Sequence, residues 1–286
     1  MKKIKYFIEF IFILFLIIIF KCLGYKTSSN LGALIVGFFG PLFRSKKIIL
    51  NNLKKTNLNF SDDDTQKIIN NMWKNYGRIL AEYVHIKNFR NSKLKKFLSI
   101  EGEEILKEVS KNNEPVVFVS GHFNNFELMA MQIEKSGVNL AAIYRPLNNI
   151  FLNRIMISIR KKYICKNQIK KGLGGTREIL KLFKKNHSVA LMIDQRVSEG
   201  ILSNFYGRPA LTTTIPAQLV KKYKCKVITL YIERINNVHF KLYVNKPINF
   251  NQSLSIEEIT QDLNYRLENM ISFNPSQWIW SHNRWK

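Results

Sequence analysis

Short apolar runs alternate with amphipathic segments along most of the chain, and this alternation predicts an α/β protein. The apolar runs are short enough to be buried strands and cover residues 116–119, 139–144, 188–193, 226–233 and 239–244. The segments with a helical pattern cover residues 126–133, 151–163, 177–185, 217–223 and 255–271. Such alternation favours one domain built on a mixed β-sheet flanked by helices.

Residues 46–87 precede the first predicted strand and are expected to be helical. Ser61 and the acidic run at 62–64 supply an N-cap and a negative first turn for a helix over residues 65–84. Apolar side chains such as Ile68, Trp73 and Leu80 recur along that helix at helical spacing. We therefore interpret this aromatic-rich stretch as core rather than as a ligand platform.

The N-terminus carries the longest apolar run, eleven residues at 10–20, and Glu9 alone separates it from three further apolar residues. This is shorter than the ~20 residues that cross a bilayer. Lys2, Lys3 and Lys5 would suit a signal peptide, but no A-x-A-like cleavage site follows the run. We expect an uncleaved, membrane-anchoring transmembrane helix at the N-terminus.

A second apolar stretch at residues 31–43 is too short and too rich in glycine to span a membrane. We expect it to form an interfacial or re-entrant element beside the anchor. The predicted organisation is a membrane anchor with an interfacial segment at 1–45 and a larger domain at 46–286. The larger domain is expected on the cytoplasmic face of the membrane.

His122 and Glu127 form the most informative pair of side chains. Gly121 and His122 follow the predicted strand at 116–119, and Glu127 falls in the first turn of the next helix. A loop at the carboxyl end of a buried strand is where open α/β sheets bind ligands. A carboxylate that holds one ring nitrogen of His122 would let the other nitrogen take a proton from a hydroxyl. A hydrogen-bonded cap without catalytic function is the structural alternative.

Two further predicted strands also end in charged residues. Arg145 follows residues 139–144, and Asp194 follows residues 188–193, so both are expected near His122 at one edge of the sheet. Lys171 lies in a basic, glycine-rich turn that opens the predicted helix beginning at Arg177. Backbone N–H groups at such a helix start can bind phosphate.

The composition is strongly basic, with 45 Lys and Arg against 20 Asp and Glu and a net charge of +25. This excess indicates a polyanionic partner, which the charge alone leaves open among nucleic acid, anionic lipid and a phosphorylated glycolipid. The three cysteines are widely spaced and contain no C-x-x-C. The pattern therefore predicts neither a disulfide framework nor a zinc site.

Several blocks together resemble the bacterial lipid A biosynthesis acyltransferases, the late lauroyl and myristoyl transferases of the lysophospholipid acyltransferase superfamily. The resemblance runs nearly from end to end and includes an H-x4-E motif at His122 and Glu127. The other blocks are Tyr144-Arg145-Pro146, residues 174–177, Asp194-Gln195 followed by residues 205–214, and the tryptophan-rich ending at 277–286.

The resemblance implies an O-acyltransferase that moves a fatty acyl chain from acyl carrier protein to a hydroxyl of a lipid A precursor. His122 would be the general base, oriented by Glu127, and no metal, cofactor or acyl-enzyme is expected. Arg145, Arg177 and Lys171 would bind the phosphorylated glycolipid acceptor, with Asp194 organising the arginines. An ion pair with a structural carboxylate is the alternative role for each arginine. Anionic inner-membrane lipid is an expected partner and the bacterial inner membrane the expected location.

Two alternatives differ in substrate or in class. One is an acyltransferase of the same superfamily that acts on a lysophospholipid or another glycolipid. The other is a membrane-tethered nucleic-acid-binding protein, which the net charge suggests. The chain contains no helix-turn-helix, zinc or RNP-like motif, so no nucleic acid is expected as a partner.

Overall fold

The computed structural model describes residues 2–42 and 45–286, and a seven-stranded sheet lies at its centre. The strand order is β1-β9-β8-β2-β5-β3-β4. The strands are β1 (Leu98–Glu101), β2 (Val117–Ser120), β3 (Leu140–Tyr144), β4 (Asn167–Lys170), β5 (Ser188–Met192), β8 (Val227–Ile235) and β9 (His239–Val244). Strand β9 is antiparallel to β8, whereas the other neighbouring pairs are parallel. The predicted mixed α/β sheet is therefore confirmed.

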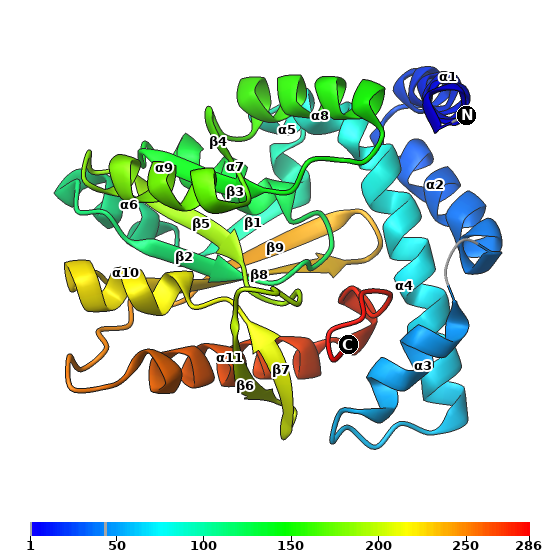
Figure 1. Ribbon diagram of the computed structural model, residues 1–286. Coiled ribbons are helices and arrows are strands. Elements are labelled where there is room, and N and C mark those ends of the chain that lie inside the picture. The colour runs from blue at the N-terminus through cyan, green and yellow to red at the C-terminus, as the bar shows by residue number, and fades with distance from the viewer. Residues whose placement is uncertain (1, 43–44) are drawn as a thin grey trace.

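Helices cover both faces of this sheet (Figure 1). They are α5 (Ile86–Arg90), α6 (Glu103–Asn112), α7 (Glu127–Lys135), α8 (Ile150–Tyr163), α9 (Leu173–Phe183), α10 (Ile215–Tyr223) and α11 (Ile256–Phe273). Figure 1 shows α7 and α8 above the sheet and α10 and α11 below it. All four residues of β2 are buried, which explains why this segment is an unbroken apolar run rather than an alternating one.

The N-terminal third forms a helical layer beside the sheet. It contains α1 (Lys2–Cys22), α2 (Tyr25–Phe39), α3 (Lys46–Lys54) and α4 (Asp62–Glu82), with 3-10 turns η1 (Gly40–Leu42) and η2 (Tyr83–His85). A capping box between Ser61 and Asp64 starts α4, close to the predicted start. Helices α2 and α4 touch where Gly32 meets Gly77. A Cβ atom on Gly32 would lie 2.3 Å from the Gly77 oxygen, so both positions require glycine.

Helix α1 rests on α8, with Phe7 and Phe10 each 5.7 Å from the Phe151 ring centre. Over residues 2–42 and 45–286, no helix is both long and apolar enough to cross a membrane. The expected transmembrane helix is therefore not found, because Glu9 and the flanking lysines shorten the uncharged stretch of α1.

The second apolar stretch forms the C-terminal part of α2 and η1. It is helical because α2 buries a stripe of small residues against α4, including Ser29, Gly32 and Ala33. Residues 43 and 44 of this region lie outside the described residues.

Several elements were not predicted. Strand β4 is a short, polar edge strand, and β1 and α6 precede the first strand that the apolar pattern predicted. Strands β6 (Ile201–Phe205) and β7 (Arg208–Thr212) form a separate hairpin, whose turn residues Tyr206 and Gly207 have φ angles of 53° and 71°. Two consecutive positive φ angles are the geometry of a tight hairpin turn. Helix α9 begins at Leu173, earlier than the predicted 177.

Candidate active site

His122 and Asp194 meet because β2 and β5 are neighbours in the sheet. The two strands are parallel, with Ser120 opposite Met192, so the residues that follow them emerge at the same edge. His122 Nδ1 lies 2.8 Å from Asp194 Oδ1, and the His122 backbone N–H donates to Asp194 Oδ2 at 2.8 Å. A carboxylate accepts only, so Nδ1 carries the proton and Nε2 is the basic nitrogen.

Asp194 is completely buried and remains a strong acceptor. Burial by itself disfavours its ionised form, but the charge of His122 and three hydrogen bonds outweigh burial and lower the pKa of Asp194. The third hydrogen bond comes from the indole N–H of Trp278, at 2.9 Å. The His122 side chain is 22% exposed, so its ring lies between a fixed carboxylate and solvent.

Glu127 has a different partner from the one expected. Its Oε1 accepts from Arg160 Nε at 2.8 Å and from the Arg160 terminal nitrogen, and both side chains are nearly buried. Among the described residues Glu127 makes no hydrogen bond to His122. The expectation that Glu127 orients the imidazole is corrected, because the neighbouring strand delivers Asp194 to Nδ1. Glu127 instead joins the start of α7 to the C-terminal half of α8.

Asp194 likewise does not organise arginines at the sheet edge. Its hydrogen bonds go to His122 and Trp278, and neither Arg145 nor Arg177 is among its described partners. Strand β3, which leads to Arg145, is a direct neighbour of β5, but the Asp194 carboxylate turns toward His122, which follows the neighbour on the other side, β2.

The loop between His122 and Glu127 is tightly packed. A Cβ atom on Gly121 would lie 2.9 Å from the Leu267 side chain of α11 and from the Phe123 ring, so a larger residue where the chain leaves β2 would displace these side chains. Phe123 is fully buried, and the Phe126 ring lies edge-on to His122 at 4.9 Å. Phe123 and Phe126 therefore pack the loop against the protein core, while the His122 side chain remains partly exposed to solvent.

The predicted cationic residues line the same edge farther along the sheet. Arg145 follows β3, Lys171 follows β4 and Arg177 lies in α9, and all three are exposed. Within residues 2–42 and 45–286, no carboxylate forms an ion pair with any of them. Their charges therefore face solvent, where a phosphorylated ligand could reach them.

The C-terminal segment contributes side chains that sequence reasoning did not assign to the site. Besides Trp278, the fully buried Arg284 donates to Leu211 O and Thr212 Oγ1 and stacks on Phe205 at 4.8 Å. Burial lowers the pKa of Arg284 to about 10, with Asp194 opposing the shift. The only signal in the sequence was the dense tryptophan pattern at the end, which does not say what those indoles bind.

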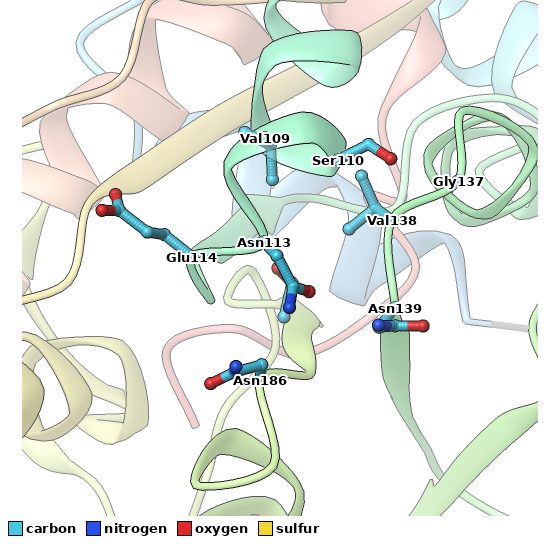
Figure 2. Close-up of a pocket in the computed structure, with 9 residues that line it drawn as sticks. Val109, Ser110, Asn113, Glu114, Gly137, Val138, Asn139 and Asn186 are labelled. Carbon is cyan, nitrogen blue, oxygen red and sulfur yellow. The ribbon is translucent and has the colours of Figure 1, made fainter.

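Other features of the molecule do not add to this site. The hollow in Figure 2 lies at the opposite edge of the sheet, between Asn113, Gly137 and Asn186, and its volume of about 10 Å³ is enough for roughly one water molecule. In the described part of the chain, no group of three or more His, Cys, Asp or Glu side chains could hold a metal ion.

Comparison with known proteins shows the family to which the chain belongs. A histidine that is hydrogen-bonded to a buried carboxylate at the carboxyl end of parallel strands has the chemistry that proton transfer needs. The model of the family of bacterial lipid A biosynthesis acyltransferases matches residues 1–286. The chain belongs to this family and is an O-acyltransferase.

Curated relatives are consistent with that assignment. The lipid A biosynthesis palmitoleoyltransferase of Escherichia coli K12 is 24% identical over 274 residues, which cover 92% of this chain and 86% of the relative. A lipid A biosynthesis acyltransferase of Shigella flexneri matches to the same extent. Acyltransferase 2 of lipid A biosynthesis from the same organism is 22% identical over 226 residues, or 77% of this chain and 71% of the relative.

Proposed function

We propose that this acyltransferase moves a fatty acyl chain from acyl carrier protein to a free hydroxyl of a phosphorylated lipid A precursor, with His122 as the general base. The observation that carries the proposal is the hydrogen bond between His122 Nδ1 and the buried Asp194 carboxylate. It fixes the ring and favours the imidazolium that forms when Nε2 accepts a proton.

The proposed reaction is a single displacement. His122 Nε2 takes the proton of the acceptor hydroxyl while its oxygen attacks the thioester carbonyl. A C–O ester bond forms, the C–S bond breaks, and the thiolate leaves and takes the proton back from the imidazolium. The negative oxygen of the intermediate needs a hydrogen-bond donor, usually worth about 3 kcal/mol. Arg145 and the backbone N–H groups near His122 are the two candidates.

Glu127 enters this proposal through Arg160. The ion pair joins α7, which begins at the motif, to α8, and the side chains of both partners are less than about one-eighth exposed. Arg160 also lies 5.9 Å from the ring of Tyr144, at the end of β3. In the H-x4-E motif, His122 is thus the proposed base, and Glu127 holds the neighbouring helix α8 through Arg160.

The charge distribution supports both substrates. Arg145, Lys171 and Arg177 lie at the edge that follows β3 and β4, without carboxylate partners in the described structure, and suit the phosphates of the acceptor. The remaining basic excess suits an acidic carrier protein and anionic lipid. Positive charge on the protein thus suits the acceptor, the carrier protein and the lipid alike.

Membrane association is part of the proposal and rests on the outer faces of α1, α2 and η1. Large apolar side chains are about half or more exposed there: Ile4, Phe7, Ile8, Ile11, Phe12, Phe15, Ile18, Leu34, Phe38, Phe39 and Leu42. Lysines border this surface at both ends of α1. Such a face suits helices that lie in the interface of an anionic membrane, here the cytoplasmic face of the bacterial inner membrane.

The test uses the full-length protein in vesicles that contain anionic lipid. Acyl carrier proteins loaded with chains of different lengths are supplied with a tetra-acylated, phosphorylated lipid A precursor, and mass spectrometry identifies the products. We expect one added acyl mass with the wild type. His122→Ala should lower the rate at least about 100-fold. His187→Ala, a histidine in the turn before β5, is the matched control and should retain full activity.

Other outcomes change the proposal in defined ways. Transfer to a lysophospholipid but not to the lipid A precursor would keep the base and replace the acceptor. Transfer from acyl-coenzyme A alone would replace the donor. Full activity of a folded His122→Ala variant would rule out His122 as the base.

A further inference from the structure

The H-x4-E loop is held from inside the protein by its two asparagines. Asn124 has a φ of +42° and donates to the Ile232 carbonyl at 2.7 Å and to the Gln277 side chain. Asn125, completely buried, donates to Glu82 Oε2 at 3.2 Å. The residues between His122 and Glu127 therefore have defined partners of their own, one on β8 and the other on α4.

Glu82 is the centre of a buried polar network. Its carboxylate is fully buried and pairs with Arg234 of β8, whose Nη2 donates to Oε2 at 3.0 Å. Ser29 of α2 donates to Oε1 at 2.8 Å. The Glu82 carboxylate thus accepts hydrogen bonds from α2, from β8 and, through Asn125, from the loop. The reaction proposed above assigns no role to Glu82.

Arg234 is itself fixed in place on several sides. Its Nε donates to Asn75 Oδ1 at 2.9 Å, Nη1 donates to the Asn237 carbonyl at 2.9 Å, and its guanidinium stacks on Phe240 at 4.6 Å. Its backbone N–H and carbonyl bind the side chain of Gln277, which also binds Asn124. Arg234 is therefore connected to both asparagines of the motif loop, to Asn124 through Gln277 and to Asn125 through Glu82.

A buried ion pair of this kind adds little stability over an apolar pair of similar size, but it restrains geometry strongly. Losing the acceptor for Asn125 would leave a second polar atom of its amide without a partner, since Oδ1 already has no described partner. The loop would then be free to shift by a fraction of an ångström, which is enough to misplace a catalytic base.

We infer that Glu82 is a positioning residue for the acyl transfer, which holds the His122 loop through Asn125 while Arg234 and Ser29 hold its carboxylate. The inference rests on the proposed function, because it assigns the role to the loop that carries the proposed base. It links α2, on the apolar face proposed to meet the membrane, to the catalytic loop through two side-chain hydrogen bonds.

The experiment compares four variants of the full-length protein in vesicles. Glu82→Gln keeps the shape of the side chain. It replaces the oxygen that accepts from the Asn125 amide by an NH2 group, so two donors face each other. Asn125→Ala removes the loop partner and leaves the Glu82–Arg234 pair intact. The double variant Glu82→Gln, Asn125→Asp exchanges the two roles, so that the amide at position 82 donates to a carboxylate at position 125. Glu134→Gln is the matched control, because it removes a Glu–Arg pair, with Arg90, that does not touch the loop.

We expect Glu82→Gln and Asn125→Ala each to lower kcat about 10- to 100-fold with KM changed less than about twofold. The double exchange should recover a large part of kcat, so that the two effects are not additive. Glu134→Gln should retain wild-type kcat even if its melting temperature falls.

A second measurement is independent of the acyl transfer. Diethyl pyrocarbonate modifies histidine, and peptide mass spectrometry gives the rate at His122, which should rise in Glu82→Gln and in Asn125→Ala but not in Glu134→Gln. If the wild type transfers no acyl group, the proposed function fails and this rate still tests the loop. Wild-type kcat and wild-type modification of His122 in a folded Glu82→Gln variant would overturn the inference. If Glu82→Gln does not fold, the same result for Asn125→Ala would overturn it.

Discussion

The edge of the sheet that carries the proposed active site has two halves that are built differently. After β2 and β5, His122 is hydrogen-bonded to the buried Asp194, which also accepts from Trp278. The loop that follows His122 is held by hydrogen bonds from Asn124 to Ile232 and from Asn125 to Glu82. After β3 and β4, the cations are exposed and have no carboxylate partner in the described chain. The closed half suits a base that must not move, and the open half suits charges that meet a ligand. Rigidity and accessibility are thus separated along one edge.

The closed half should be most sensitive at Asp194. Asp194→Asn keeps the size of the side chain but can donate to Nδ1, which favours the wrong tautomer of His122. We expect kcat to fall about 100- to 10,000-fold with little change in KM, measured by steady-state acyl transfer. Glu127→Gln provides the comparison, and a larger loss there than in Asp194→Asn would contradict the assignment of Asp194 to the imidazole.

The open half should respond in KM instead. Replacing Arg145 and Arg177 by glutamine removes two charge-assisted contacts, each worth about 1.5–3 kcal/mol when made to phosphate. We expect KM for the phosphorylated acceptor to rise at least about tenfold and kcat to change little. Lys185→Gln, beyond the end of α9, is the control. An unchanged KM that is also independent of salt would place the acceptor phosphates elsewhere.

A smaller effect is expected where the indole of Trp278 donates to Asp194. Trp278→Phe keeps an aromatic ring in the core and removes that donor, so one acceptor of a buried carboxylate loses its partner. A loss of about 1 kcal/mol corresponds to a several-fold lower kcat in the acyl-transfer assay. Trp285→Phe removes an indole that donates to the Phe205 carbonyl instead, and this variant should retain kcat.

The smallest predicted effect concerns stability against acid. The pKa of Asp194 lies below its ordinary value of 3.8, so its ionised form stabilises the folded state above that pH. This contribution is lost as the pH falls through the lower, folded-state pKa. The difference in unfolding free energy between the wild type and Asp194→Asn, on the order of 1 kcal/mol by urea titration at pH 7, should shrink below pH 4. A difference that grows toward low pH would contradict this sign.

Prediction from sequence succeeded where one local pattern dictates the element. The apolar run that became β2 and the Ser61–Asp64 capping box that starts α4 both lie close to where they were expected. It failed at β4 and at the β6–β7 hairpin, because those strands carry polar residues and gain their partners from distant segments. Propensity over a short window does not contain that information.

His122, its place after a buried strand and the start of a helix at Glu127 were determined by the sequence alone, since each follows from neighbouring residues. Which carboxylate the imidazole meets was decided only by the tertiary structure. Insertion of β5 between β2 and β3 brings Asp194 to His122, 72 residues away, and leaves Glu127 to Arg160. The order of strands depends on how whole helices and strands pack, so spacing along the chain cannot reveal it.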